Sequence, residues 1–269
     1  MTTYTQGYTS SVLKSHQSRT AAVQAAHVLP YITSSSHILD IGCGPGTITC
    51  DFAFLATQGQ VIGADFSDEV LATARAEAER RGGLGNLTFQ VADAKNLPFD
   101  DDTFDVVHCH ALLVHVPNAS AVVKEMHRVC KTGGCVACRE PDWDTMVIYP
   151  LSASLAQWQR AQRELNVTVG SEPNTGRHLA SWALAAGFDG INVRVTTDVL
   201  QYFGREEVKW WGEAYAERVT GDFGKRAVES GLLTREEIER ISEAWREWSR
   251  GADGALFALM HMRLLAQKW

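Results

Sequence analysis

The sequence has no block of lysine and arginine residues, and its charge balance is negative. It contains 25 Lys and Arg against 32 Asp and Glu in 269 residues, for a formal net charge of −7. Nucleic acids and anionic membranes attract positively charged surfaces, so neither is expected as a partner.

The chain also has no apolar run of the length that a membrane-spanning helix requires. Its polar first residues, 1–6, do not have the pattern of a signal peptide. We expect a cytoplasmic protein, and the length fits one α/β domain with an added subdomain. There are no internal repeats and no low-complexity segments.

The sequence also lacks the two neighbouring Cys or His pairs that a typical structural zinc site requires. Six cysteines are present, and Cys135 and Cys138 form a Cys-x-x-Cys pair inside an apolar segment that predicts a strand. Residues three apart on a strand point to opposite faces, and no second Cys or His pair with zinc-ligand spacing lies near them. We therefore expect reduced cysteines and no metal.

A glycine-rich loop follows the first predicted strand. The apolar run 38–41 includes Asp40, and Gly42, Gly44 and Gly46 follow at alternate positions before a helical pattern begins at Thr47. Glycine permits the sharp turn and the close approach of a ligand to the main chain. The spacing differs from the Gly-x-Gly-x-x-Gly of dinucleotide-binding folds.

Two acidic residues follow at the ends of later predicted strands. Asp65 ends the apolar run 61–65, roughly 20 residues after the loop, where a doubly wound fold presents a carboxylate to ribose hydroxyls. A carboxylate can accept two hydrogen bonds from a vicinal diol. Asp93 follows the strand-like segment 89–91. A strand-end Asp taken alone is more often a helix cap or turn residue.

Together, the Asp-x-Gly-x-Gly-x-Gly loop and the two acids resemble the class I S-adenosyl-L-methionine (SAM)-dependent methyltransferases over about residues 37–142. The segment 114–118 is similar to the HHVPD stretch of the ubiquinone and menaquinone biosynthesis type, with Val114 and Asn118 as departures. The resemblance implies SAM as cofactor and S-adenosyl-L-homocysteine (SAH) as product. The implied cofactor-binding residues are Tyr8, Arg19, Asp40, Gly42, Cys43, Gly44, Asp65, Phe66, Asp93, Ala94 and His110.

The fold class expected from this resemblance is α/β, with a Rossmann-like, seven-stranded, mostly parallel sheet whose last two strands are antiparallel. We expect an N-terminal helical lid (1–36), a SAM-binding core (37–204), a helical substrate cap (205–250) and a final core strand (251–269). Ser67, Asn118 and Thr234 are predicted helix N-caps, the last in a capping box with Glu237.

Candidates for the catalytic and the substrate-pocket residues follow from their positions in the sequence. His110 ends the fourth predicted strand and His115 lies in the loop after it, so both are candidate catalytic residues, although a structural or binding role is the more common one for a lone histidine. Trp143, Trp210 and Trp211 are candidate substrate-pocket residues, with ordinary core packing as the alternative.

The N-terminal pattern around Tyr4–Tyr8 and 12–20 looks like fungal members of this group that serve secondary metabolism. One member type S-methylates the dithiol form of gliotoxin, an epipolythiodioxopiperazine, and we expect a thiol acceptor of this kind. A thiol is partly ionised at neutral pH, which fits the lack of an obvious acid–base pair. The alternatives are O- or C-methylation of another secondary metabolite or quinol, a SAM-binding enzyme that does not methylate, or a SAM-binding regulator. A monomer or homodimer is expected.

Overall fold

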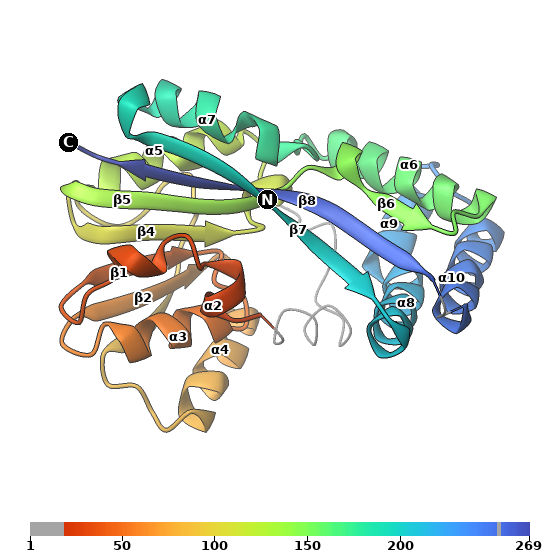
Figure 1. Cartoon of the computed structure of the whole chain (residues 1–269), viewed down its shortest axis with the longest axis horizontal. Helices are drawn as coiled ribbons and strands as arrows, with labels where there is room; N and C mark the ends of the chain where they lie inside the picture. The colour runs from red at the N-terminus through yellow and green to blue at the C-terminus, as the bar shows by residue number, and fades with distance from the viewer. Residues whose placement is uncertain (1–18, 252–253) are drawn as a thin grey trace.

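The computed structural model of the protein describes residues 19–251 and 254–269 (Figure 1). Within them, eight strands form one sheet. The strands are β1 (His37–Ile41), β2 (Gln60–Asp65), β3 (Leu87–Val91), β4 (Phe104–His110), β5 (Cys130–Pro141), β6 (Val147–Tyr149), β7 (Val193–Phe203) and β8 (Leu256–Gln267). The expected count of seven strands is one too low, because the short β6 pairs with the beginning of β8.

The sheet has a parallel part and an antiparallel part. The strand order is β3-β2-β1-β4-β5-β8-β6, and β7 pairs with β8 along its other edge. The pairs among β1 to β5 are parallel, whereas β5, β6 and β7 all run antiparallel to β8. The predicted α/β class and the antiparallel arrangement of the last two long strands are confirmed.

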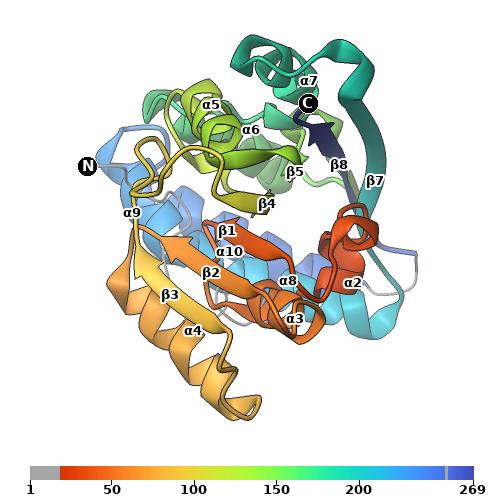
Figure 2. The ribbon, with the colours of Figure 1, turned by 90° about the vertical axis from the view of Figure 1, so that its left-hand side faces the viewer.

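Helices cover both faces of the sheet. They are α2 (Ala21–Gln24), α3 (Thr47–Leu55), α4 (Asp68–Arg80), α5 (Ala119–Val129), α6 (Ala153–Thr168), α7 (Thr175–Ala186), α8 (Arg205–Thr220), α9 (Asp222–Glu229) and α10 (Arg235–Arg250). Figures 1 and 2 show α5 and α7 on one face, with α2 and α3 on the other.

Successive side chains of a strand point to opposite faces of the sheet, which explains the two apolar layers. Cys138 packs in the core cluster that includes α5 and α7, whereas Cys135 packs in the cluster that includes α2 and α3. The two sulfur atoms therefore lie on opposite faces of the sheet, as the strand pattern predicts. None of the six cysteines forms a disulfide among the described residues.

Two of the three predicted helix caps are confirmed. The Ser67 hydroxyl accepts a hydrogen bond from the Val70 amide, and Thr234 and Glu237 form the expected capping box. The prediction for Asn118 is wrong: it occupies the N-cap position of α5, but its side chain makes no cap hydrogen bond. Its backbone is left-handed (φ 58°), and its Oδ1 accepts from the Ser120 hydroxyl instead.

The segment between β7 and β8 folds into α8, α9 and α10. These helices pack with α6 and with the first half of β8 in a separate core cluster that includes Trp158, Trp245 and Phe257. In Figure 1 this cluster lies at the opposite end of the long β7–β8 pair from β1 to β3. No helix among the described residues is both long and apolar enough to cross a membrane.

Gly46, at the start of α3, offers a test of the packing below the glycine loop. Its φ is +77°, and an added Cβ would lie 2.8 Å from the Ala74 Cβ and 3.0 Å from the Phe89 Cζ. We expect Gly46→Ala to lower the free energy of unfolding by about 2–4 kcal/mol, through backbone strain and overpacking together.

Gly231 is the matched control for this substitution. Its φ is +73°, but no described atom lies within 4 Å of an added Cβ. Gly231→Ala should therefore cost about 1–2 kcal/mol, from backbone strain alone. Urea denaturation measures both values, and equal losses in the two variants would contradict the packing argument.

Candidate functional site

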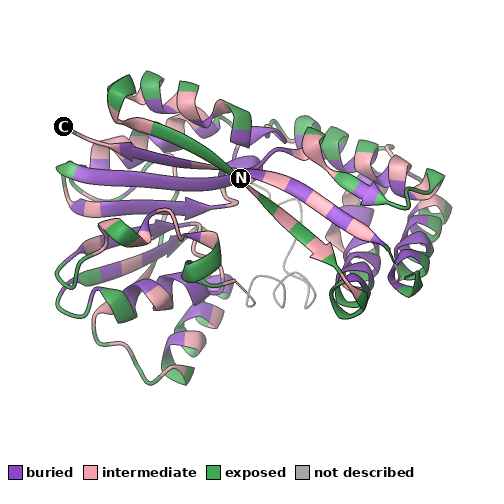
Figure 3. Ribbon diagram, in the orientation of Figure 1, coloured by how far each residue is buried: buried purple, intermediate pink, exposed green. Residues whose placement is uncertain are grey.

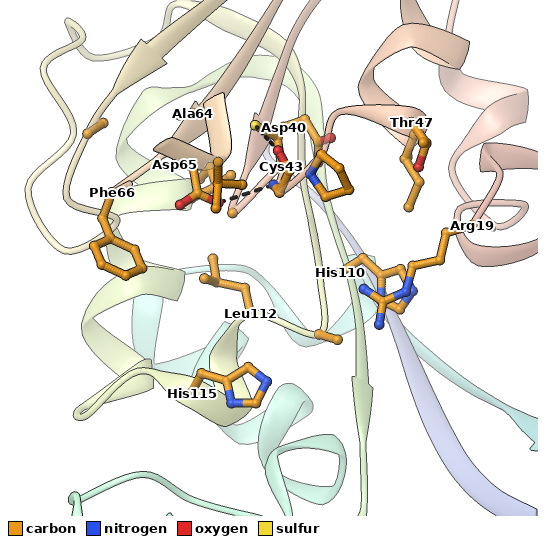
Figure 4. Close-up of a pocket in the computed structure, with 18 of the residues that line it drawn as sticks. Arg19, Asp40, Cys43, Thr47, Ala64, Asp65, Phe66, His110, Leu112 and His115 are labelled. Carbon is orange, nitrogen blue, oxygen red and sulfur yellow. Dashed lines mark hydrogen bonds between the residues drawn. The ribbon is translucent and has the colours of Figure 1, made fainter. Parts of the chain in front are cut away.

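A cavity opens at the carboxyl ends of β1, β2 and β4 (Figure 4). Ligands bind at this edge in open α/β folds. The described residues that line it are Arg19, Asp40, Ile41, Gly42, Cys43, Gly44, Pro45, Thr47, Ile48, Ala64, Asp65, Phe66, Val70, Ala92, His110, Ala111, Leu112, His115 and Val116.

The glycine loop forms one wall of the cavity. The φ values of Gly42 and Gly44 are +66° and +54°, which is the left-handed region that favours glycine. A Cβ on Gly42 would lie 2.7 Å from the Leu112 Cδ1 atom, whereas one on Gly44 would meet no described atom within 4 Å. The Cys43 amide donates to the Ala64 carbonyl at 3.0 Å, which ties the loop to the end of β2.

Asp65 lies at the end of β2 beside this loop. Its Oδ2 accepts a hydrogen bond from the Gly44 amide, and its Oδ1 accepts one from the Ser67 amide, both at 3.1 Å. Burial raises the pKa of Asp65, and the backbone hydrogen bonds oppose that shift. The carboxylate thus positions the loop while facing the cavity (Figure 4).

Asp40 has partners on both oxygens. Its Oδ1 lies 2.7 Å from the His108 Nδ1, and its Oδ2 accepts from the Thr49 hydroxyl at 2.6 Å. It is 3% exposed, so it faces the cavity from a buried position. These contacts join β1, β4 and α3 at the base of the glycine loop.

A buried carboxylate that the sequence analysis did not identify shapes the opposite wall. Glu140, at the end of β5, accepts hydrogen bonds from the amides of Leu112, Leu113 and Val114 at 2.9, 3.0 and 3.2 Å. Its side chain thereby fixes the segment after β4 that carries Leu112 and His115. Burial raises the pKa of Glu140 to about 7, although the three amide hydrogen bonds favour the ionised form.

The two candidate catalytic histidines are both poor bases. Burial lowers the pKa of His110 well below its usual range, and the charges of Arg19 and Arg139 lower it further. Burial, with a contribution from Arg19, lowers the pKa of His115 to about 3. Both imidazoles are neutral at pH 7. In addition, neither ring nitrogen of His110 has a hydrogen-bond partner among the described residues.

The structure brings most of the predicted cofactor residues into one cavity. Those that line it are Arg19, Asp40, Gly42, Cys43, Gly44, Asp65, Phe66 and His110, together with the candidate catalytic residue His115. Tyr8 lies outside the described residues. Asp93 and Ala94 are not among the lining residues: the Asp93 carboxylate accepts from the Lys95 amide within its own turn, and Ala94 packs against the core.

The three candidate substrate tryptophans are not among the described lining residues either. Trp211 is 4% exposed and stacks on Tyr202 at a centroid distance of 3.9 Å. Trp143 packs against the cluster of α6 and α8 to α10, and Trp210 is 36% exposed beside Tyr202. Within the described chain, no group of three His, Cys, Asp or Glu residues could hold a metal ion.

Comparison with known proteins identifies the family. A family model described as a methyltransferase domain matches residues 32–214. An uncharacterized methyltransferase of Schizosaccharomyces pombe is 31% identical over 94% of this chain and 92% of its own length. The protein ltbC of Aspergillus luteorubrus, which carries a provisional methyltransferase assignment, is 33% identical over 98% and 97%.

A solved structure from Bacillus halodurans, also assigned provisionally as a methyltransferase, superposes with a TM-score of 0.61. It is 19% identical and covers 92% of this chain and 99% of that one. The chain belongs to the methyltransferase domain family, and its predicted place among the SAM-dependent methyltransferases is confirmed. Membership in this class makes SAM its cofactor.

Proposed function

We propose that the cavity in Figure 4 holds SAM along the glycine loop, between Asp65 and Arg19. The buried Asp65 carboxylate suits the ribose hydroxyls, and Phe66 beside it offers an aromatic face to the adenine. In Figure 4, Arg19 lies away from Asp65 and beside His110, where its guanidinium suits the methionine carboxylate. Bare backbone at Gly42 and Gly44 supports this fit, because the ligand can approach the main chain closely.

The bound cofactor would supply an activated methyl group, so the protein needs mainly to position and desolvate the nucleophile. Glu140 serves this role indirectly, because its three hydrogen bonds hold Leu112 and His115 against the cavity. His110 faces the cavity from the end of β4, where neutral ring nitrogens can orient an acceptor.

We propose that the acceptor is the thiol of a small molecule. The observation that carries this proposal is the low basicity of both cavity histidines, which leaves neither suited to remove a proton at pH 7. The lining carboxylates, Asp40 and Asp65, are engaged in hydrogen bonds within the fold. A thiol with a pKa of about 8.5 supplies its own ionised nucleophile, whereas an alcohol does not.

The dithiol form of gliotoxin is our best specific acceptor, with residues 205–250 as the proposed substrate cap. The proposal includes a cytoplasmic location and no nucleic-acid partner, in keeping with the net charge of −7.

The experiment compares acceptors that differ in the nucleophile alone. Thiophenol and phenol, each supplied with SAM, are assayed for methylated product by mass spectrometry between pH 6 and 9. We expect methylation of the thiol, with a rate that follows the ionisation of the thiol in solution. Methylation of phenol at a rate equal to or above that of thiophenol would contradict the thiol proposal.

A further inference from the structure

A polar row interrupts the apolar face of the sheet beside the cavity. Every second residue of β8 points to this face, and the series from Phe257 to Leu265 contains His261 and Arg263 in its middle. Phe257 belongs to the core cluster of α8 and α10, whereas Leu265 belongs to the cluster of α2 and α3. The two polar residues therefore occupy the gap between two apolar clusters.

Strand pairing extends this polar position across the sheet. Arg263 of β8 is the register partner of Arg139 of β5, which is in turn the partner of His110 of β4. Register partners on neighbouring strands point to the same face. His261 is the register partner of Asp198 on β7, and we call these five residues the polar row.

The polar row contains two arginines but a single acidic residue, Asp198, so one positive charge is left uncompensated within the row. The Arg139 Nε donates to the Asp198 Oδ2 at 3.1 Å, and the Arg263 Nη2 donates to the same oxygen. Two guanidinium groups thus share one carboxylate oxygen. The rings of His110 and His261 lie edge to face at 6.5 Å, and both are held neutral by burial and by the nearby arginines.

Several polar atoms of the row are buried without a hydrogen-bond partner among the described residues. They are both ring nitrogens of His110, the Arg263 Nε and the Asp198 Oδ1. Buried polar groups in folded proteins are nearly always paired with protein or ordered water, so unpaired atoms that share one face call for an explanation. A bound anion at the row would accept hydrogen bonds from the Arg263 Nε and from the single ring N–H of neutral His110, and it would neutralise the excess charge, whereas the Asp198 Oδ1 is itself an acceptor and gains no partner from an anion.

The row also reaches the cavity. His110 belongs to both, and the charges of Arg19 and Arg139 both act on its ring. Figure 3 shows β8 alternating between buried and partly buried residues, and the Arg263 side chain remains 23% exposed. We propose that the polar row is the acceptor subsite and that it selects acceptors that carry a negative charge at neutral pH. This inference rests on the proposed methyl transfer to a thiol.

The negative charge could reside on the reacting thiolate or on a separate carboxylate, and three probes distinguish these sources. They are 4-mercaptobenzoate, its methyl ester, and the S-methylated methyl ester, which carry a thiolate and a carboxylate, a thiolate alone, and neither. Calorimetry measures their binding to the full chain saturated with SAH at a pH where the two thiols are ionised.

If the row recognises the thiolate, the first two probes bind with similar affinity, and the third binds at least about tenfold more weakly than they do. If the row recognises a separate carboxylate, only the first probe binds tightly. Equal binding of all three probes would overturn the proposal.

Two substitutions with opposite effects test the residues themselves. Arg263→Met removes a positive charge and should weaken binding of the preferred anion about tenfold or more, whereas Asp198→Asn removes the competing carboxylate and should strengthen it. Arg194→Met, an exposed position on the same strand as Asp198, is the matched control and should change nothing. Because Asp198→Asn is expected to strengthen anion binding, misfolding of either variant cannot produce both expected results.

A parallel assay of labelled methyl transfer to 4-mercaptobenzoate and its ester separates the two proposals. Anion-selective binding without transfer would contradict the thiol acceptor and leave the subsite standing. Transfer with no response to Arg263→Met and Asp198→Asn would leave the proposed function and overturn the subsite.

Discussion

Replacing Asp65 with alanine should weaken SAM binding by about 1.5–3 kcal/mol, which is about ten- to 150-fold in the dissociation constant. One part of this loss would come from the charge-assisted hydrogen bonding to the ribose that we propose for Asp65. A second part arises in the protein itself, since the carboxylate also accepts hydrogen bonds from the Gly44 and Ser67 amides. Without it, the glycine loop loses a contact that fixes its conformation.

Asp93→Ala is the control, because both acids were predicted from the same kind of strand-end position. The Asp93 side chain is exposed and caps its own turn through the Lys95 amide. Its removal should change the SAM affinity by less than about 0.5 kcal/mol. Calorimetric titration of both variants with SAM and SAH decides the matter: unchanged affinity in Asp65→Ala would remove this residue from the cofactor site.

Mild acid should destabilise the protein steeply. Burial lowers the pKa of His27 and His115 to about 3, and it holds the pKa of His110 and His261 well below the usual range. In the unfolded chain these groups titrate near pH 6.5, so below that pH the unfolded state binds more protons than the folded state. The stabilisation is complete well above pH 6.5 and is lost progressively as the pH falls through 6.5 and below.

Each such histidine costs about 1 kcal/mol between pH 6.5 and 5.5, and the slope approaches about 1.4 kcal/mol per pH unit at lower pH. Glu140 acts in the opposite sense, because its pKa is raised to about 7 and the folded state binds its proton more tightly. The net loss between pH 6.5 and 5.5 is about 3 kcal/mol, which is a large fraction of the stability of an ordinary domain.

Urea denaturation at several pH values measures this loss. His27→Gln should lower the number of protons that the chain takes up on unfolding by about one, because residue 27 then no longer titrates. The free energy of unfolding should therefore depend less steeply on pH in this variant. His178→Gln is the control, since that side chain is 41% exposed. A free energy of unfolding that stays constant from pH 6.5 to 5.5 would contradict the buried neutral histidines.

The sequence-based prediction of the fold succeeded where local patterns decide the structure. The glycine loop, the strand ending at Asp65 and the helix cap at Ser67 depend on neighbouring residues, and all three occur as expected. The strand β6 was missed because it is three residues long and forms through pairing with β8, more than 100 residues later in the chain.

The site was harder to predict because it depends on contacts between distant segments. Glu140 holds the amides of residues 112–114, and a single carboxylate at the end of a strand does not reveal which backbone it faces. Trp211 resembles a pocket residue in the sequence, yet stacking on Tyr202 buries it in the core. The pairing of Arg139 and Arg263 with Asp198 likewise requires the register of three strands.

The most direct test of the account is methyl transfer itself. The purified protein is incubated with SAM labelled at the methyl group and with thiols that include dithiol gliotoxin, and mass spectrometry measures labelled thioether and SAH. We expect the two products in equal amounts, and a lower yield at limiting SAM in Asp65→Ala but not in Asp93→Ala. Binding of SAM with no SAH formed from any thiol, phenol or quinol would contradict the proposed function and would favour a SAM-binding protein that does not methylate.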